Sequence, residues 1–198
     1  MIFEHQHFSF NCVPKTGSKT TSAWCEANGL IEVNILNQKK PVFATMRDHK
    51  DRIISGIFED IFHLTLTKFN ITGLEPFDDI KHLYENTINN WLLNYTKKVL
   101  PSECHYAKLE SYFLTSKRID MSTVHWIHMD DILIIDQLIN KTLGFDLKLT
   151  PVVPENFIFD NRRPPKEWFF EIIKENSQVL SWINNLADRD YTPTYIKL

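Results

Sequence analysis

The stretch Cys12-Val-Pro-Lys-Thr-Gly-Ser-Lys-Thr-Thr21 lies between two segments of different pattern. Before it, Phe8-Ser-Phe-Asn-Cys-Val13 has the alternation of a strand, and after it residues 19–28 predict a helix that ends near Gly29. A short glycine-containing loop between a strand and a helix can turn its backbone N–H groups toward an anion, and the helix N-terminus adds partial positive charge. Cationic and hydroxyl side chains in this loop and the first helical turn add to that effect: Lys15, Thr16, Ser18, Lys19, Thr20 and Thr21. The sequence therefore predicts an anion-binding loop over residues 14–18.

This loop differs from the common nucleotide-triphosphate loop, which reads G-x-x-x-x-G-K-S/T. Here Ser18 separates Gly17 from Lys19, and Cys12 or Val13 stands where the first glycine is required. The segment instead resembles the 5′-phosphosulfate loop of sulfotransferases that use 3′-phosphoadenosine 5′-phosphosulfate, commonly P-K-T-G-S/T-S/T. Residues 14–18 match it position for position, and the pattern departs at Lys19, where the family usually has a small hydroxyl residue.

A second motif follows the predicted strand 42–46. The segment Arg47-Asp-His-Lys-Asp-Arg-Ile-Ile-Ser-Gly-Ile57 resembles R-D/N-P-x-x-R-x-x-S-x-Y/F, which the same sulfotransferases carry directly after a strand. Four residues match in identity and spacing: Arg47, Asp48, Arg52 and Ser55. The resemblance implies that Arg47 and Ser55 bind the 3′-phosphate of the nucleotide, a role that suits the forked guanidinium of arginine. His49 replaces the usual proline, and Ile57 replaces the aromatic residue.

The order of the predicted elements indicates an α/β fold. Strands are expected at 8–13, 30–36, 42–46 and 122–128, and helices at 19–28, 50–65, 78–99, from Asp130 or Asp131 to 143, and at 166–187. Such alternation predicts a mostly parallel sheet flanked by helices, and the resemblance implies a P-loop-like three-layer sandwich. With 198 residues and no linker, a single sulfotransferase-like domain over 1–198 is expected.

Composition narrows the possible partners. The net charge of −3 argues against a protein that coats nucleic acid or membranes, so an anion must bind to a local cluster. No segment approaches the roughly 20 apolar residues of a membrane span, and the N-terminus lacks the order of a signal peptide. We therefore expect a soluble or cytoplasmic protein without a nucleic-acid partner. No metal site is expected either, because His125 and His128 would face opposite sides of their strand.

The resemblance implies transfer of a sulfuryl group from the nucleotide donor to a hydroxyl, which we expect to belong to a carbohydrate. Lys15 would neutralise charge on the leaving phosphate oxygen. The residues expected to bind the nucleotide are Lys15, Thr16, Gly17, Ser18, Lys19, Thr20, Arg47, Ser55, Arg162 and Arg163. A base must accept the proton of the acceptor hydroxyl, and Glu32, His105 and His49 are the alternatives. The acceptor cleft is expected at the carboxyl ends of the strands.

Two other functions stay open on the sequence alone. A P-loop kinase that uses ATP and magnesium needs a serine or threonine after the loop lysine, and Lys19-Thr20 imitates that pair. This hypothesis leaves the spacing of Arg47 and Ser55 unexplained. A non-catalytic nucleotide-binding module would keep the fold and lack the base.

Overall fold

In the computed structural model of this chain, the described residues are 1–73, 75–96, 109–113, 118–152 and 162–198. They form two compact units. The first comprises Met1–Asp48, Ala107–Asn156 and Asp190–Leu198, and the second comprises His49–Tyr106 and Phe157–Arg189. Segments of the two units alternate along the chain. The expected organisation as one domain over residues 1–198 stays a prediction.

The first unit contains a mixed sheet with the strand order β3-β1-β2-β4-β5 among the described residues. The strands are β1 (Ile2–Glu4), β2 (Ser9–Asn11), β3 (Ile31–Val33), β4 (Val42–Met46) and β5 (Val124–His128). β2, β4 and β5 are parallel neighbours, whereas β1 pairs antiparallel with both β2 and β3. The predicted α/β class is confirmed. Among the five described strands, parallel pairing is confined to β2, β4 and β5, because the unpredicted strand β1 lies between β2 and β3.

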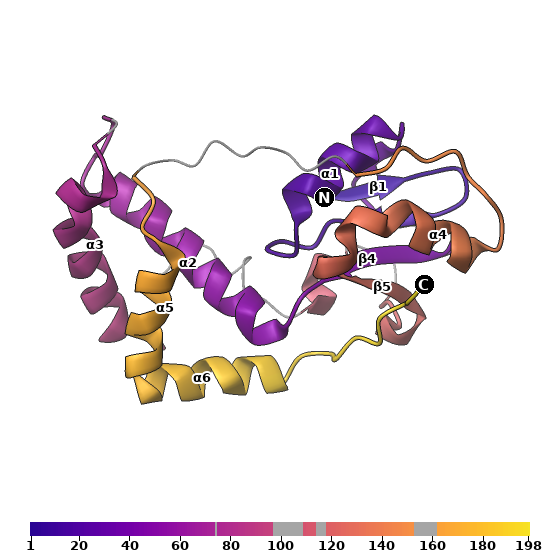
Figure 1. Cartoon of the computed structure of the whole chain (residues 1–198). Helices are drawn as coiled ribbons and strands as arrows, with labels where there is room; N and C mark the ends of the chain where they lie inside the picture. The colour runs from indigo at the N-terminus through magenta and orange to yellow at the C-terminus, as the bar shows by residue number, and fades with distance from the viewer. Residues whose placement is uncertain (74, 97–108, 114–117, 153–161) are drawn as a thin grey trace. The chain divides into compact units, whose positions relative to one another are not determined.

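The two faces of this sheet have separate apolar clusters. On one face, Phe10 and Phe43 pack with residues of α1 (Ser18–Ala27) and α4 (Ile135–Leu143); Figure 1 shows these two helices beside the sheet. On the other face, Ala44 and Trp126 pack with Phe113 and with Met121 of the 3-10 turn η3 (Met121–Thr123). The alternation of β4 explains the division, because successive side chains of a strand point to opposite faces. The first of these clusters includes residues of both β2 and α1, so it packs the strand before the loop against the helix after it.

The second unit consists of helices packed around one core. Its helices are α2 (His49–Lys68), α3 (Phe77–Leu92), α5 (Lys166–Glu175) and α6 (Ser177–Asp188). Their shared core is aliphatic and aromatic, and includes Ile57, Phe58, Ile61, Tyr84, Trp91, Phe169 and Ile183. The helices predicted at 50–65 and 78–99 correspond to α2 and to α3, which ends earlier.

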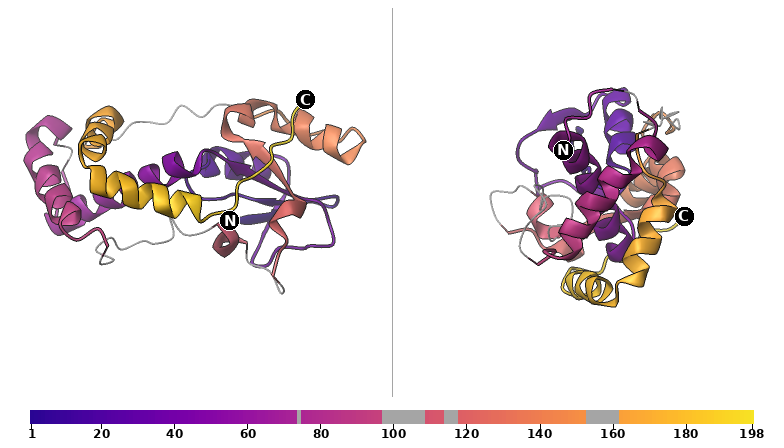
Figure 2. Two further views of the ribbon diagram at one scale, coloured as in Figure 1. Left: turned by 90° about the horizontal axis from the view of Figure 1, so that it is seen from below. Right: turned by 90° about the vertical axis from the view of Figure 1, so that its left-hand side faces the viewer.

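The single helix predicted at 166–187 is wrong. The chain breaks at Asn176, whose backbone is extended with φ −99° and ψ 90°. Its side-chain oxygen accepts a hydrogen bond from the N–H of Val179 at 3.0 Å, so Asn176 caps α6 instead of continuing α5. Figure 2 shows that the axes of α5 and α6 point in different directions. The helix predicted from Asp130 or Asp131 likewise begins as a 3-10 turn, η4 (Met129–Ile134), before α4.

Candidate functional site

The loop between β2 and α1 has an alternating backbone. Lys15 has φ 62° and Gly17 has φ 78°, and Thr16 between them is not in the positive-φ region. A non-glycine residue rarely adopts this left-handed conformation, which costs on the order of 1 kcal/mol, so the surrounding structure must hold Lys15 in it. Alternation between right- and left-handed residues turns successive N–H groups toward one concave side, and such concavities bind anions. Lys15 and Gly17 thus have the left-handed backbone that such a concavity requires, and anion binding by residues 14–18 stays a prediction.

Helix α1 begins directly after this loop. Gly17 is its N-cap, and no side chain of the described residues caps it by a hydrogen bond. The N–H of Thr21 donates to the carbonyl oxygen of Gly17 at 2.9 Å, as in a regular helix. Ser18, Lys19 and Thr20 come before Thr21 in the first turn. The N–H groups at this end of an α-helix have no carbonyl acceptor within the helix. Because the first turn contains no acidic residue, the partial positive charge of the helix end is not offset there.

Two buried threonines fix the loop against the sheet. The hydroxyl of Thr16 donates to the carbonyl oxygen of Val13 at 2.8 Å, and its Oγ1 lies 3.1 Å from Oγ1 of Thr45 on β4. Both threonines are fully buried. The Thr16 side chain, predicted to bind the nucleotide, is therefore held inside the protein by these two contacts.

Gly17 packs closely against the turn that follows β5. A Cβ atom at this position would lie 2.7 Å from Cδ1 of Ile132 in η4. Together with the contact between Thr16 and Thr45, this packing places the loop beside the ends of β4 and β5. Open sheets with parallel strands bind ligands outside these carboxyl ends.

Arg47 directly follows β4 at the same edge of the sheet and is half-buried. The structure thus places Arg47 two residues beyond Thr45, which touches the loop. Ser55, the other residue predicted for the 3′-phosphate, lies on α2 in the second unit, so its part in this site stays a prediction.

His128 and Tyr195 also lie at the carboxyl ends of the parallel strands, and the sequence had predicted no binding or catalytic role for them. His128 ends β5, and its ring lies edge-on to the ring of Tyr195, with centroids 4.8 Å apart. Tyr195 reaches this place because the last residues pair with β5, where the N–H of Ile196 donates to the carbonyl oxygen of Trp126 at 2.8 Å. Burial raises the pKa of Tyr195, and the negative charge of Asp48 adds to the effect. No local sequence pattern marks such terminal pairing.

The three candidate bases have different settings. Glu32 is exposed on the edge strand β3, with β1 between that strand and β2. His49 is the first residue of α2 in the second unit. His105 lies outside the described residues. The part of each of the three as the base therefore stays a prediction.

Arg162 and Arg163 are engaged within the second unit. The guanidinium of Arg163 donates to both carboxylate oxygens of Glu59, at 2.8 and 3.0 Å, and lies 4.5 Å from the ring centroid of Phe62. Arg162 donates to the carbonyl oxygen of Gly73 at 3.4 Å. A two-point ion pair of this kind gives Arg163 a structural role, and nucleotide binding by the two arginines stays a prediction.

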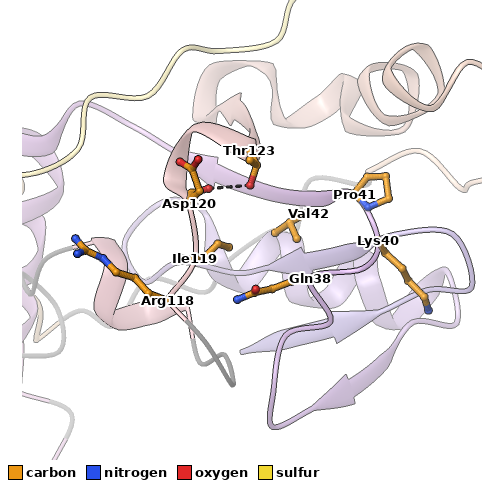
Figure 3. Close-up of a pocket in the computed structure, with 8 residues that line it drawn as sticks. All are labelled: Gln38, Lys40, Pro41, Val42, Arg118, Ile119, Asp120 and Thr123. Atoms are coloured by element: carbon orange, nitrogen blue, oxygen red, sulfur yellow. Dashed lines mark hydrogen bonds between the residues drawn. The ribbon is translucent and has the colours of Figure 1, made fainter.

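A pocket of about 430 Å³ lies at the opposite, amino-terminal edge of β4 and β5. Figure 3 shows Arg118 and Lys40 on two sides of it, with Val42 and Ile119 between them. Part of its polar rim is already bonded inside the protein: Lys40 donates to Glu4 and to the carbonyl oxygen of His5, and Thr123 donates to the carbonyl oxygen of Asp120. This pocket is separate from the loop, because it lies at the other ends of the same strands.

Comparison with known proteins adds no relative: no family model matches the chain, and no curated protein or solved structure matches it significantly. Within the described part of the chain, no group of three or more His, Cys, Asp or Glu side chains is arranged to hold a metal ion. His125 stacks on Phe43, while His128 contacts Tyr195 of the other apolar cluster, so the two histidines point to opposite faces. In the described ranges, no helix is both long and apolar enough to cross a membrane.

Proposed function

We propose that this protein is a sulfotransferase that moves a sulfuryl group from 3′-phosphoadenosine 5′-phosphosulfate to a hydroxyl, most suitably of a carbohydrate. The observation that carries the proposal is the loop at residues 14–18, where the sequence Pro-Lys-Thr-Gly-Ser coincides with a left-handed Lys15 and Gly17 at the start of an uncapped helix. The residue motif and the two positive φ angles support the same ligand chemistry, because glycine-containing loops before a helix and left-handed loop residues both occur where anions bind.

In the proposed transfer, the loop, Lys15 and Arg47 each have a defined part. The backbone N–H groups of the loop hold the 5′-phosphate, and Lys15 stabilises the negative charge that develops on its bridging oxygen as the sulfur–oxygen bond breaks. Arg47 binds the 3′-phosphate through its forked guanidinium. The acceptor oxygen attacks sulfur in line and gives up its proton to a base, for which Glu32, His105 and His49 stay alternatives. We also propose that β2, β4, β5 and α1 are the nucleotide-binding part of a P-loop-like sandwich.

Calorimetry with three nucleotides tests the proposal. Adenosine 3′,5′-bisphosphate should bind more tightly than AMP or than ATP with magnesium, because only the bisphosphate presents a phosphate to Arg47. The preference should disappear in Arg47→Ala, whereas Arg118→Ala, at the opposite edge of the sheet, should keep it. Equal affinity for AMP and the bisphosphate would exclude the second phosphate site. Preference for ATP with magnesium would instead favour a kinase.

A further inference from the structure

The contact between the loop and β4 consists of two hydroxyl groups in an otherwise closed environment. Thr16 and Thr45 each have 0% exposed surface, and their Oγ1 atoms are 3.1 Å apart. Thr45 lies on β4, which is paired on both sides, with β2 and with β5. Thr16 lies between the two left-handed residues of the loop. A hydrogen bond between them therefore joins a strand that is paired on both sides to the residue between the two left-handed positions of the loop.

The direction of this hydrogen bond follows from proton counting. A threonine hydroxyl has one proton and two lone pairs. Thr16 uses its proton on the carbonyl oxygen of Val13, at 2.8 Å, so the proton between the two threonines comes from Thr45. The hydroxyls thus form a chain that runs from Thr45 to Thr16 to Val13. Hydrogen bonds in such a chain polarise and strengthen one another in a low-dielectric interior.

We propose that Thr45 is a positioning residue for the anion-binding loop. Its hydroxyl, acting through Thr16, holds the backbone of Lys15 and Gly17 in the left-handed conformation before a ligand arrives. Preorganisation of this kind raises affinity, because the cost of ordering the loop is met during folding. The positioning role of Thr45 rests on the proposed function only for the identity of the ligand, which is the nucleotide.

Three substitutions separate the hydroxyl from the packing. Thr45→Val keeps the shape and removes the donor, whereas Thr45→Ser keeps the donor. The control is Thr65→Val: Thr65 is also 0% exposed and donates to the carbonyl oxygen of Ile61 at 2.8 Å, but it lies on α2 in the second unit. If Thr45→Val does not fold, Thr45→Cys, a small side chain with only a weak donor, replaces it.

The first measurement is the affinity for adenosine 3′,5′-bisphosphate by calorimetry. Thr45→Val should weaken binding on the order of tenfold, the usual effect of one lost hydrogen bond. Thr45→Ser should stay within about twofold of wild type, since its donor is retained. Thr65→Val should keep the wild-type affinity even if its melting temperature falls. Wild-type affinity in Thr45→Val, or an equal loss in Thr65→Val, would overturn the positioning role.

The second measurement needs no ligand and distinguishes this inference from the proposed function. Amide hydrogen exchange should become faster over residues 15–18 in Thr45→Val and stay unchanged there in Thr45→Ser and Thr65→Val. If wild type binds no bisphosphate while exchange follows this pattern, the sulfotransferase proposal fails and the positioning role stands. Unchanged exchange in Thr45→Val would refute the positioning role whatever the ligand.

Discussion

At the scale of single residues, Lys15 combines a chemical and a conformational property. Its ammonium is the cation of the loop motif, and its φ of 62° belongs to the region that glycine adopts without strain. The sequence predicted the first property from the residues around it. The second was outside sequence reasoning, because lysine has no preference for that conformation and adopts it only where the folded structure requires it.

Replacing Lys15 by two different residues separates these properties. Lys15→Ala and Lys15→Gly should both reduce sulfuryl transfer on the order of a hundredfold, because both remove the ammonium that stabilises the leaving oxygen. Only Lys15→Gly should keep or raise the free energy of unfolding, since glycine tolerates the positive φ. Turnover and denaturant unfolding measure the two effects. Near-normal turnover in both variants would transfer the role to Lys19.

A second prediction at this scale concerns the response to acid. Burial lowers the pKa of His125 below the ordinary value of about 6.5. The lowered pKa means that the folded protein disfavours protonation, so this contribution to stability is complete above about pH 6.5 and is lost as pH falls through the folded-state pKa. His125→Phe should make urea unfolding midpoints less dependent on pH between 7 and 5. His82→Gln, at an exposed position on α3, should leave the dependence unchanged.

At the scale of elements, sequence patterns were reliable where structure is local. The alternation before Cys12 and the glycine after it predicted β2, the loop and α1, and the buried run 42–46 became β4. Strand β1 was missed because three residues show no periodicity and exist as a strand only through pairing with β2 and β3. The break at Asn176 was missed because apolar spacing continues across it, and a single side-chain bond decides the local conformation.

The fit between the loop and η4 can be tested at Gly17. Gly17→Ala should destabilise the protein and abolish nucleotide binding, because its φ is 78° and the new Cβ would lie 2.7 Å from Cδ1 of Ile132. Gly144→Ala is the matched control, since φ is 76° and no described atom lies within 4 Å of its Cβ. Gly144→Ala should lower the free energy of unfolding by about 1 kcal/mol, through backbone strain alone. Adding Ile132→Val to Gly17→Ala should recover part of the loss, and no recovery would exclude the steric explanation.

At the scale of the whole molecule, the described residues divide into a sheet unit and a helical unit, each with its own apolar clusters. The loop, Thr45 and Arg47 all belong to the sheet unit, whereas Ser55, Arg162 and Arg163 belong to the helical one. Sequence motifs placed these residues in one functional group because motifs carry order and spacing. Motifs carry no information on which apolar cluster the surrounding segments join, and the clusters are what separate the sheet unit from the helical unit.

The net charge of −3 gives the last prediction its physical basis. A protein with a negative net charge attracts a multiply charged nucleotide only through local cations, which Lys15 and Arg47 would supply in the proposed site. A sulfuryl group in transfer carries less charge than a phosphoryl group, so these side chains should suffice without a metal ion. Transfer of labelled sulfate to a panel of glycans and phenols should therefore proceed equally with and without EDTA, and glycans should be the better acceptors. Transfer of labelled phosphate from ATP that EDTA abolishes and magnesium restores, without transfer of sulfate, would identify a kinase and contradict both the metal independence and the sulfuryl chemistry.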